Sequence, residues 1–341
     1  MARDSDIQVI APNFSRRLSG VTASINSVVP HQVQLMEIAT TGNVSDPALP
    51  HIPVWKIPFL SRKRRIWHAR RNNEMIVGVL LKYVFRSDLK LVFTSSSPRK
   101  RGRLTHFLLR HMDAIIATAD QNAKVMPHTE AIVPHGVDTE VFAPGDEDVF
   151  GIGHKRVIGC FGRIRQKKGT HDFVKAMCAV LPEHPDWIAV IVGKVTKAHK
   201  EYAQSLRSDI AKNGLNDRIL FKDEVPLSKV ADAYRSLSLY VAPSHLEGYG
   251  LTPFEAMSSG VPTIATRVGA QALAVGNSGA GCAVDPNNPD ALTKACADML
   301  ENRNTLAEAG IAARQHVEQH FAIENEARAL VEVYQRLLAA E

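Results

Sequence analysis

Cysteine is scarce and unpatterned in this chain of 341 residues. The four cysteines are widely spaced and form no C-x-x-C pair: Cys160, Cys178, Cys282 and Cys296. This spacing argues against a zinc site and a disulfide framework, and predicts buried, reduced thiols. No run approaches the roughly 20 apolar residues that span a bilayer, and the first residues lack the apolar core of a signal peptide. We therefore expect a globular, cytoplasmic protein that is neither exported nor inserted into a membrane.

The remaining composition is ordinary, with 45% hydrophobic and 22% charged residues. These values exclude a disordered or fibrous chain, and no internal repeat of solenoid period is visible. A chain of this length exceeds what one hydrophobic core usually serves, so two domains are expected.

Acidic residues are almost missing from one segment. Between Trp55 and Arg110 there are 15 Lys or Arg but only two acids, Glu74 and Asp88, whereas the whole chain carries a net charge of +6. Runs such as Arg62-Lys63-Arg64-Arg65 and Arg99-Lys100-Arg101 predict a strongly positive face. Such a face fits anionic lipid or lipopolysaccharide phosphates, a nucleic acid, or a role in solubility alone.

Short apolar runs alternate with stretches of helical period, which predicts α/β domains with parallel sheets. The expected strands of the first series are at 7–12, 52–57, 89–94, 114–117 and 131–133, and those of the second at 157–161, 188–192, 219–222, 239–242 and 263–266. A segment rich in breakers and acids, from Phe142 to Asp148, separates the two series, and three helices at 289–301, 304–320 and 323–338 close the chain. The predicted domains are residues 1–145 and 146–320, both Rossmann-like and doubly wound, with a helix in residues 321–341 that crosses back to the first.

One segment of the second series carries two carboxylates eight positions apart. Glu247 and Glu255 flank a glycine turn that follows a strand, and Pro253 begins a helix. The turn's backbone N–H groups can face an anion at the helix start. Earlier, Arg163 and Lys168 lie in a glycine-containing loop after the strand 157–161, an arrangement that suits a diphosphate.

These motifs resemble the retaining GT-B glycosyltransferases of family 4, the glycosyl transferases group 1. Four matches occur in family order over nearly the whole chain: Val133 to Asp138 with Phe142 and Pro144, Gly162-Arg163-Ile164 with Lys168-Gly169, the E-x7-E pair Glu247 and Glu255, and Ser258 to Pro262. The resemblance implies two Rossmann-like domains facing across a cleft, of which the first binds the acceptor and the second the nucleotide sugar.

The resemblance also implies roles for individual residues. Arg163 and Lys168 bind the donor diphosphate, Glu255 holds the ribose hydroxyls, and Glu247 contacts the transferred sugar, so Glu247, Arg163 and Lys168 are the expected catalytic residues. The other expected donor contacts are Gly248, Tyr249, Gly250, Leu251, Gly162 and Gly20. Arg16 and Arg17 are candidates for an anionic acceptor.

The chain departs from the family pattern in the first domain. Many relatives carry an active-site histidine after a strand at which this chain has Ser95-Ser96-Ser97. Ser95 and Ser96 are therefore further candidates for acceptor binding, or serve only to cap the following turn. His106 and His111 lie on a basic helix and are expected to be surface or packing residues.

The whole-chain pattern is most similar to the lipopolysaccharide core mannosyltransferases of Gram-negative bacteria. This implies GDP-mannose as donor and an inner-core sugar, Kdo, as acceptor. A transferase that uses UDP-glucose, UDP-galactose or UDP-N-acetylglucosamine on a lipid-linked glycan is the alternative, and a catalytically silent polyanion-binding scaffold is the non-enzymatic one.

Two expectations follow for cofactors and partners. No Asp-x-Asp pair lies in a suitable loop, so no metal and no other cofactor is expected. The basic segment lacks the aromatic stacking groups of nucleic-acid binders, which favours an anionic membrane, at the inner face of the cytoplasmic membrane, over nucleic acid.

Overall fold

A computed structural model describes residues 6–15, 20–43, 47–153, 156–301 and 303–340. The chain divides into two compact units, residues 1–138 with 322–341 and residues 139–321. Among the described residues, no helix combines the length and the apolar character needed to cross a bilayer.

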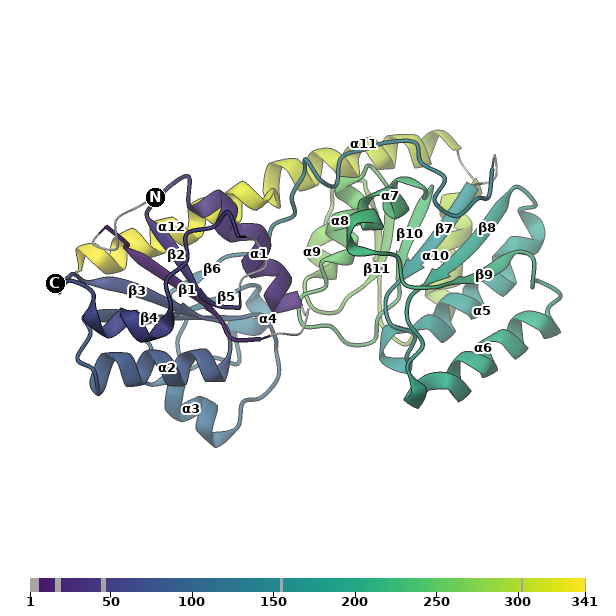
Figure 1. The fold of residues 1–341 in the computed structure, drawn as a ribbon. Coiled ribbons are helices and arrows are strands. Elements are labelled where there is room, and N and C mark those ends of the chain that lie inside the picture. Colours follow the sequence, from purple (N-terminus) through teal and green to yellow (C-terminus); the bar gives the residue numbers. More distant parts are fainter. Residues whose placement is uncertain (1–5, 16–19, 44–46, 154–155, 302, 341) are drawn as a thin grey trace. The chain divides into compact units, whose positions relative to one another are not determined.

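The first unit is built on a parallel sheet with the strand order β2-β1-β3-β4-β5-β6 (Figure 1). The strands in chain order are β1 (Val9–Asn13), β2 (Ile38–Gly42), β3 (Arg65–Ala69), β4 (Leu89–Ser95), β5 (Ala114–Ala117) and β6 (Ala131–Ile132). The helical segments are α1 (Gly20–Gln32), η1 (Val54–Phe59), α2 (Asn72–Tyr83), α3 (Arg103–Leu109), α4 (Asp120–Ala123) and α12 (Ile323–Ala339). Two cores fill its faces, one with α1 and α12 and the other with α2 and α3.

The helix α12 belongs to the first unit although it ends the chain. Its buried residues recur at helical spacing and form one apolar stripe: Ile323, Ala327, Leu330, Val331 and Tyr334. This stripe packs on α1 and on the sheet (Figure 1). At its start, the Ile323 N–H donates to the Val137 carbonyl at 2.9 Å, which brings the end of the chain to the strand edge of the first unit.

The second unit repeats the architecture with the order β12-β11-β10-β7-β8-β9, again all parallel. Its strands are β7 (Arg156–Phe161), β8 (Trp187–Val192), β9 (Ile219–Lys222), β10 (Leu239–Ala242), β11 (Thr263–Thr266) and β12 (Gly281–Val284). Its helices are α5 (Thr170–Val180), α6 (Lys200–Lys212), α7 (Val230–Arg235), α8 (Thr252–Ser258), α9 (Gln271–Val275), α10 (Pro289–Glu301) and α11 (Arg303–His320). Short 3-10 turns are η2 (Gln166–Lys168), η3 (Leu181–Glu183), η4 (Lys197–His199) and η5 (Leu227–Lys229). The continuous apolar run of β8 is buried throughout, as expected where helices cover both faces of a sheet.

One expected strand of the first unit is wrong, and two of its strands were not predicted. The strand expected at 52–57 is replaced by the 3-10 helix η1 over 54–59; Pro53, inside the expected strand, has no N–H to donate to a sheet ladder and is the N-cap of η1. The strands that were not predicted are β2 and β3. In β3 the polar Arg65 and His68 conceal a fully buried strand, and β12 was likewise missed in the second unit.

The sequence had suggested that Arg65 belongs to an exposed positive run, but its side chain is buried. It is 4% exposed, and its guanidinium donates to the carbonyls of Ile7 at 3.0 Å and Ser61 at 2.6 Å. Arg65 therefore ties the start of β3 to its neighbouring segments, while Arg62 and Lys63 are exposed.

The four cysteines are free thiols, of which Cys160 and Cys296 are buried and Cys178 and Cys282 are partly exposed. The predicted reduced state is consistent with this arrangement, although the expected burial applies fully to only two of them.

Candidate active site

The second unit brings together two loops at the carboxyl ends of neighbouring strands. One follows β7 and contains Gly162 to Gly169, and the other follows β10 and contains Pro243 to Leu251. Since β7 and β10 are adjacent and parallel, both loops leave the sheet at the same edge. This is the edge at which ligands of doubly wound sheets bind.

Lys168 and Glu247 form an ion pair between these loops. The Lys168 ammonium donates to Glu247 Oε1, and the Ser244 hydroxyl donates to the same oxygen at 3.0 Å. The two charged side chains are 19% and 13% exposed, so the pair is largely buried but still reaches the surface. The structure thus joins two of the three residues expected to be catalytic.

Gly169 allows the two loops to approach so closely. Its φ of +66° lies in the left-handed region, and a Cβ atom there would lie 1.8 Å from the Pro243 carbonyl oxygen. Beside it, the His245 N–H donates to the Lys167 carbonyl at 2.9 Å, and His245 Nε2 lies 2.8 Å from Asp172 Oδ2. The loop positions are therefore fixed by backbone contact as well as by the ion pair.

Glu255 lies on the first turn of α8 and is held by an aromatic residue. The Tyr234 hydroxyl donates to Glu255 Oε2 at 2.8 Å. Burial raises the pKa of Glu255, while the Tyr234 hydrogen bond and the charge of Lys168 oppose that rise. Burial and the neighbouring Glu255 charge raise the pKa of Tyr234 well above its usual value, so its hydroxyl remains a donor.

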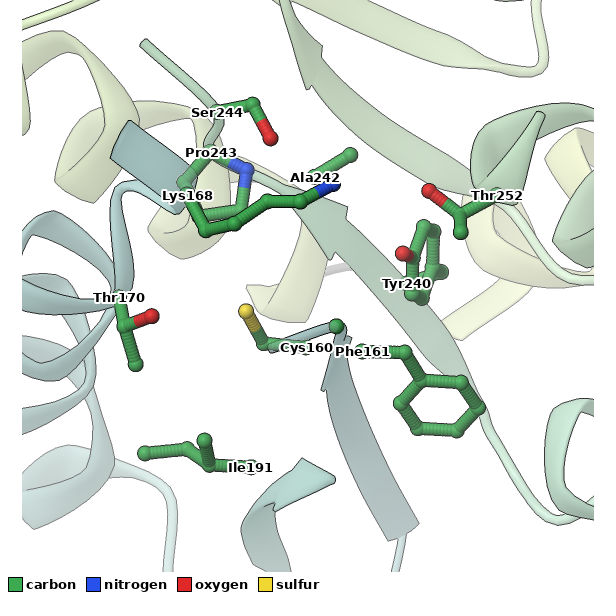
Figure 2. A pocket seen from close by; sticks show the side chains of 11 residues that line it. Cys160, Phe161, Lys168, Thr170, Ile191, Tyr240, Ala242, Pro243, Ser244 and Thr252 are labelled. Atoms are coloured by element: carbon green, nitrogen blue, oxygen red, sulfur yellow. The ribbon is translucent and has the colours of Figure 1, made fainter. Parts of the chain in front are cut away.

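A small pocket lies where these elements meet. Figure 2 shows Lys168 beside Pro243 and Ser244, with Tyr240 and Thr252 across from them and Cys160 and Thr170 below. Burial raises the pKa of the Cys160 thiol to about 12, so this cysteine stays protonated and does not act as a nucleophile. The polar groups that line the pocket are the Lys168 ammonium and the hydroxyl groups of Thr170, Tyr240, Ser244 and Thr252.

The remaining predicted donor residues lie around the same loops. Arg163 is exposed and makes no hydrogen bond or ion pair with any residue that the structure describes. Gly162 directly follows β7 with a φ of +139°, and Gly248 and Gly250 lie in the loop before α8. Tyr249 is buried and stacks on Phe254 at 5.4 Å between ring centroids, and Leu251 is the N-cap of α8. Tyr249 therefore anchors the loop through its ring.

In the first unit, the predicted acceptor residues are only partly described. Gly20 is the first residue of α1, while Arg16 and Arg17 lie outside the described residues. Ser95 ends β4 and is buried, and its hydroxyl accepts a hydrogen bond from Arg101 Nη2 at 2.8 Å. Ser96 Oγ lies 2.8 Å from His135 Nε2.

His135 joins three segments that are distant in the sequence. Its Nδ1 lies 2.8 Å from Glu326 Oε1, and the Gly136 N–H donates to Glu326 Oε2 at 2.8 Å. Both His135 and Glu326 are 5% exposed. In the tautomer of His135 that carries its proton on Nδ1, Nδ1 donates to Glu326 and Nε2 accepts a hydrogen bond from the Ser96 hydroxyl. The motif Val133 to Asp138 had pointed to this region, but Glu326 on α12 gave no signal in the sequence.

Two further polar residues at this edge also escaped the sequence analysis. His68 in β3 is buried between Thr94 Oγ1 at 2.7 Å and the Tyr334 hydroxyl at 2.5 Å. Arg70 follows β3 and is 7% exposed. Both lie in the basic segment from Trp55 to Arg110 that was interpreted as a positive face, but neither belongs to the two runs singled out in it.

No group of three or more His, Cys, Asp or Glu side chains that could hold a metal ion occurs in the described ranges. Metal independence of the reaction remains a prediction.

Comparison with known proteins gives three results. The family model described as glycosyl transferases group 1 matches residues 146–316. The lipopolysaccharide core biosynthesis mannosyltransferase LpcC of Rhizobium leguminosarum bv. viciae is 43% identical, covering 98% of this chain and 97% of its own. The similarly named LpsB of Rhizobium meliloti is 41% identical, covering 98% of both chains.

Among solved structures, Anabaena HepE in complex with UDP and glucose is similar with a TM-score of 0.79. The match covers 97% of this chain and 100% of that chain, at 17% sequence identity. At this identity the likeness concerns the fold alone, and it confirms the predicted GT-B class of two doubly wound α/β domains.

Proposed function

This chain belongs to the glycosyl transferases group 1 family and is a glycosyltransferase, and we propose that it transfers mannose from GDP-mannose to the Kdo sugar of the lipopolysaccharide inner core, with retention of the anomeric configuration. The names of the two relatives above 40% identity support mannose as the sugar and the lipopolysaccharide core as the acceptor. The observation that carries the proposal is the Lys168–Glu247 pair beside Glu255 at one strand edge of the second unit.

In this mechanism the charges of the second unit stabilise the departing nucleotide. Negative charge develops on the diphosphate as the glycosidic bond breaks, and Lys168 with the exposed Arg163 neutralises it. Positive charge develops at the same time on the sugar ring, where the ionised Glu247 favours it. No nucleophilic side chain is needed for this charge stabilisation.

Carboxylates suit the binding of hydroxyl groups on the donor. An ionised carboxylate accepts hydrogen bonds and offers no competing donor. Lys168 and the Tyr234 hydroxyl stabilise the charged form of Glu255 against its burial, so one oxygen is held by Tyr234 and the other can accept from ribose. Glu247 likewise uses only Oε1 for Lys168 and Ser244.

Nucleotide binding tests the donor. Thermal unfolding is measured with GDP, UDP, GDP-mannose and UDP-glucose, each with and without a chelator. GDP and GDP-mannose are expected to raise the melting temperature in the presence of the chelator, because a ligand of the folded state stabilises it. Stabilisation by UDP alone would identify the UDP-sugar alternative, and the absence of any nucleotide effect would favour the silent scaffold.

A basic and aromatic face supports an acceptor at a membrane. Large side chains of η1, α2 and α3 are exposed here, among them Trp55 at 65%, Phe59 at 82% and Phe107 at 56%. The face is continuous, since a surface pocket joins η1 to Phe85, and His111 contacts the rings of both Tyr83 and Phe107. Exposed aromatic residues among Lys and Arg are suited to the interface of an anionic membrane. We propose peripheral attachment through this face at the inner side of the cytoplasmic membrane.

Sedimentation with vesicles tests this attachment. The variant Arg62→Gln with Lys63→Gln is expected to lose about 2 kcal/mol of binding, roughly 30-fold, on vesicles that contain phosphatidylglycerol. The control, Lys197→Gln with Lys200→Gln, removes two exposed charges from the second unit. Equal losses in both variants would assign the binding to net charge instead of to this face. Transfer to a water-soluble acceptor should be unchanged in both.

A further inference from the structure

Arg70 is a buried cation for which the described residues supply no acidic partner. It directly follows β3, its side chain is 7% exposed, and its Nη1 atom has no hydrogen-bond partner among the described residues. A guanidinium removed from water is costly unless it is paired with an acid or fully hydrogen-bonded. Such a group in a folded protein points to an anion that the isolated chain does not supply.

Arg101 is a half-buried cation whose hydrogen-bond partners among the described residues are neutral. Its Nη2 donates to the Ser95 hydroxyl at 2.8 Å and to the Ser97 carbonyl at 3.3 Å, and both partners are neutral. Its Nε atom is buried and has no partner within the described ranges. Burial and repulsion from Arg99 lower the pKa of Arg101, which again indicates an uncompensated charge.

The two arginines belong to the same edge of the first sheet. The strands β3 and β4 are adjacent and parallel, with Ala69 opposite Phe93, so Arg70 leaves β3 where β4 reaches Ser95. Arg101 is bound to that same Ser95. The carboxyl ends of both strands therefore bear a guanidinium group.

The nearby acids are already engaged elsewhere. Glu74 accepts the backbone N–H groups of Arg70 and Arg71 and forms an ion pair with the Arg71 guanidinium at 2.8 Å. Glu326 accepts from His135 and from the Gly136 N–H. Neither carboxylate is available to neutralise Arg70 or Arg101.

We propose that Arg70 and Arg101 together bind an acidic group of the acceptor glycan, a sugar carboxylate or a phosphate, and thereby select the acceptor. This inference rests on the proposed glycosyltransferase function and adds to it the recognition chemistry of the first unit. Guanidinium groups pair with both kinds of anion through two parallel hydrogen bonds. This anion site is distinct from the basic and aromatic face, because that face consists of exposed side chains whereas Arg70 is buried.

Calorimetric titration of the full chain with a lipid-free, acidic inner-core oligosaccharide tests the site without the donor. Arg70→Gln and Arg101→Gln are each expected to weaken binding by at least tenfold, while the control Arg103→Gln, which removes an exposed charge on α3, leaves it unchanged. In turnover assays the acceptor KM should rise by the same factor and the KM for the sugar donor should not change. Wild-type affinity in both variants would overturn the proposal.

Modified acceptors identify the anion and remain informative if a variant fails to fold. Reduction of the sugar carboxylates to alcohols should weaken wild-type binding to the level of Arg70→Gln if a carboxylate is recognised, and phosphatase treatment should do so if a phosphate is. Undiminished binding after both treatments would refute the site. A wild-type protein that binds the oligosaccharide but transfers no mannose would contradict the proposed donor and leave the anion site standing.

Discussion

The strand edges of the two units treat their charges differently. In the second unit the two acids of the site have donors, Lys168 for Glu247 and Tyr234 for Glu255, while Arg163 is exposed without a partner and Arg165 Nε is buried without one among the described residues. In the first unit Arg70 and Arg101 each retain a buried nitrogen without a partner among the described residues. An edge that combines acids and cations can bind both the hydroxyl groups and the phosphates of one ligand, whereas an edge that offers cations alone is suited to an anion; we call the first edge balanced and the second unbalanced. The contrast is consistent with a nucleotide sugar at the second edge and an acidic acceptor at the first.

The largest effect is expected from the balanced edge. Lys168→Ala removes a cation that faces the developing phosphate charge and should lower kcat by about 100- to 1000-fold. The matched control is Lys167→Ala, because this exposed side chain makes no ion pair with any residue that the structure describes and its backbone carbonyl contact is retained. Steady-state kinetics with saturating acceptor measure the change. Equal rates in both variants would remove Lys168 from the mechanism.

Glu255→Ala sharpens the same comparison at the donor. The variant loses a charged acceptor of hydroxyl hydrogen bonds, worth about 1.5–3 kcal/mol, so the donor KM should rise roughly 10- to 100-fold. The acceptor KM should stay constant, since Glu255 lies in the second unit. A rise in the acceptor KM alone would reverse the assignment of the two edges.

The sequence predicted the balanced edge far better than the unbalanced one, and the reason is the length of chain that each edge uses. Glu247 and Glu255 come from one loop and one helix turn, so a local motif contains both. By contrast, Ser96, His135 and Glu326 come from three distant segments that only the folded sheet and α12 bring together. Arg70 and Arg101 were not recognised for another reason: the sequence does not show which arginines of a basic segment become buried in the folded protein.

Glu326→Ala tests the long-range network of the first unit. The variant leaves the His135 ring and the Gly136 N–H without their acceptor in a buried place, which should cost at least about 2 kcal/mol of unfolding free energy. Glu332→Ala is the control, because Glu332 is exposed on the same helix. Urea unfolding compares the two. Equal midpoints would mean that α12 is held by its apolar stripe alone.

Two glycines of the second unit have nearly equal φ values, so a comparison of their alanine variants distinguishes backbone strain from steric overlap. Gly169 and Gly214 have φ values of +66° and +68°, but only at Gly169 would a Cβ atom collide, with the Pro243 carbonyl. Both Ala variants carry the left-handed strain, and Gly169→Ala should lose about 1–3 kcal/mol more, the usual cost of overpacking. Differential scanning calorimetry of both proteins measures the excess. A difference near zero would show that the loops can separate without cost.

The smallest effect concerns His68 and depends on pH. Burial, with the positive charge of Arg70 and the neighbouring His135, lowers the pKa of His68 well below its usual value. The unfolded chain therefore takes up a proton below about pH 6.5 that the folded chain rejects, and stability falls with acidification by up to about 1.4 kcal/mol per pH unit. Above that pH both states are neutral and the contribution is constant.

His68→Asn should flatten the fall between about pH 6.5 and pH 5, whereas His106→Asn, at an exposed position, should not. If an anion binds Arg70, part of the field on His68 is cancelled, so the oligosaccharide should reduce the acid sensitivity of the wild-type protein more than that of Arg70→Gln.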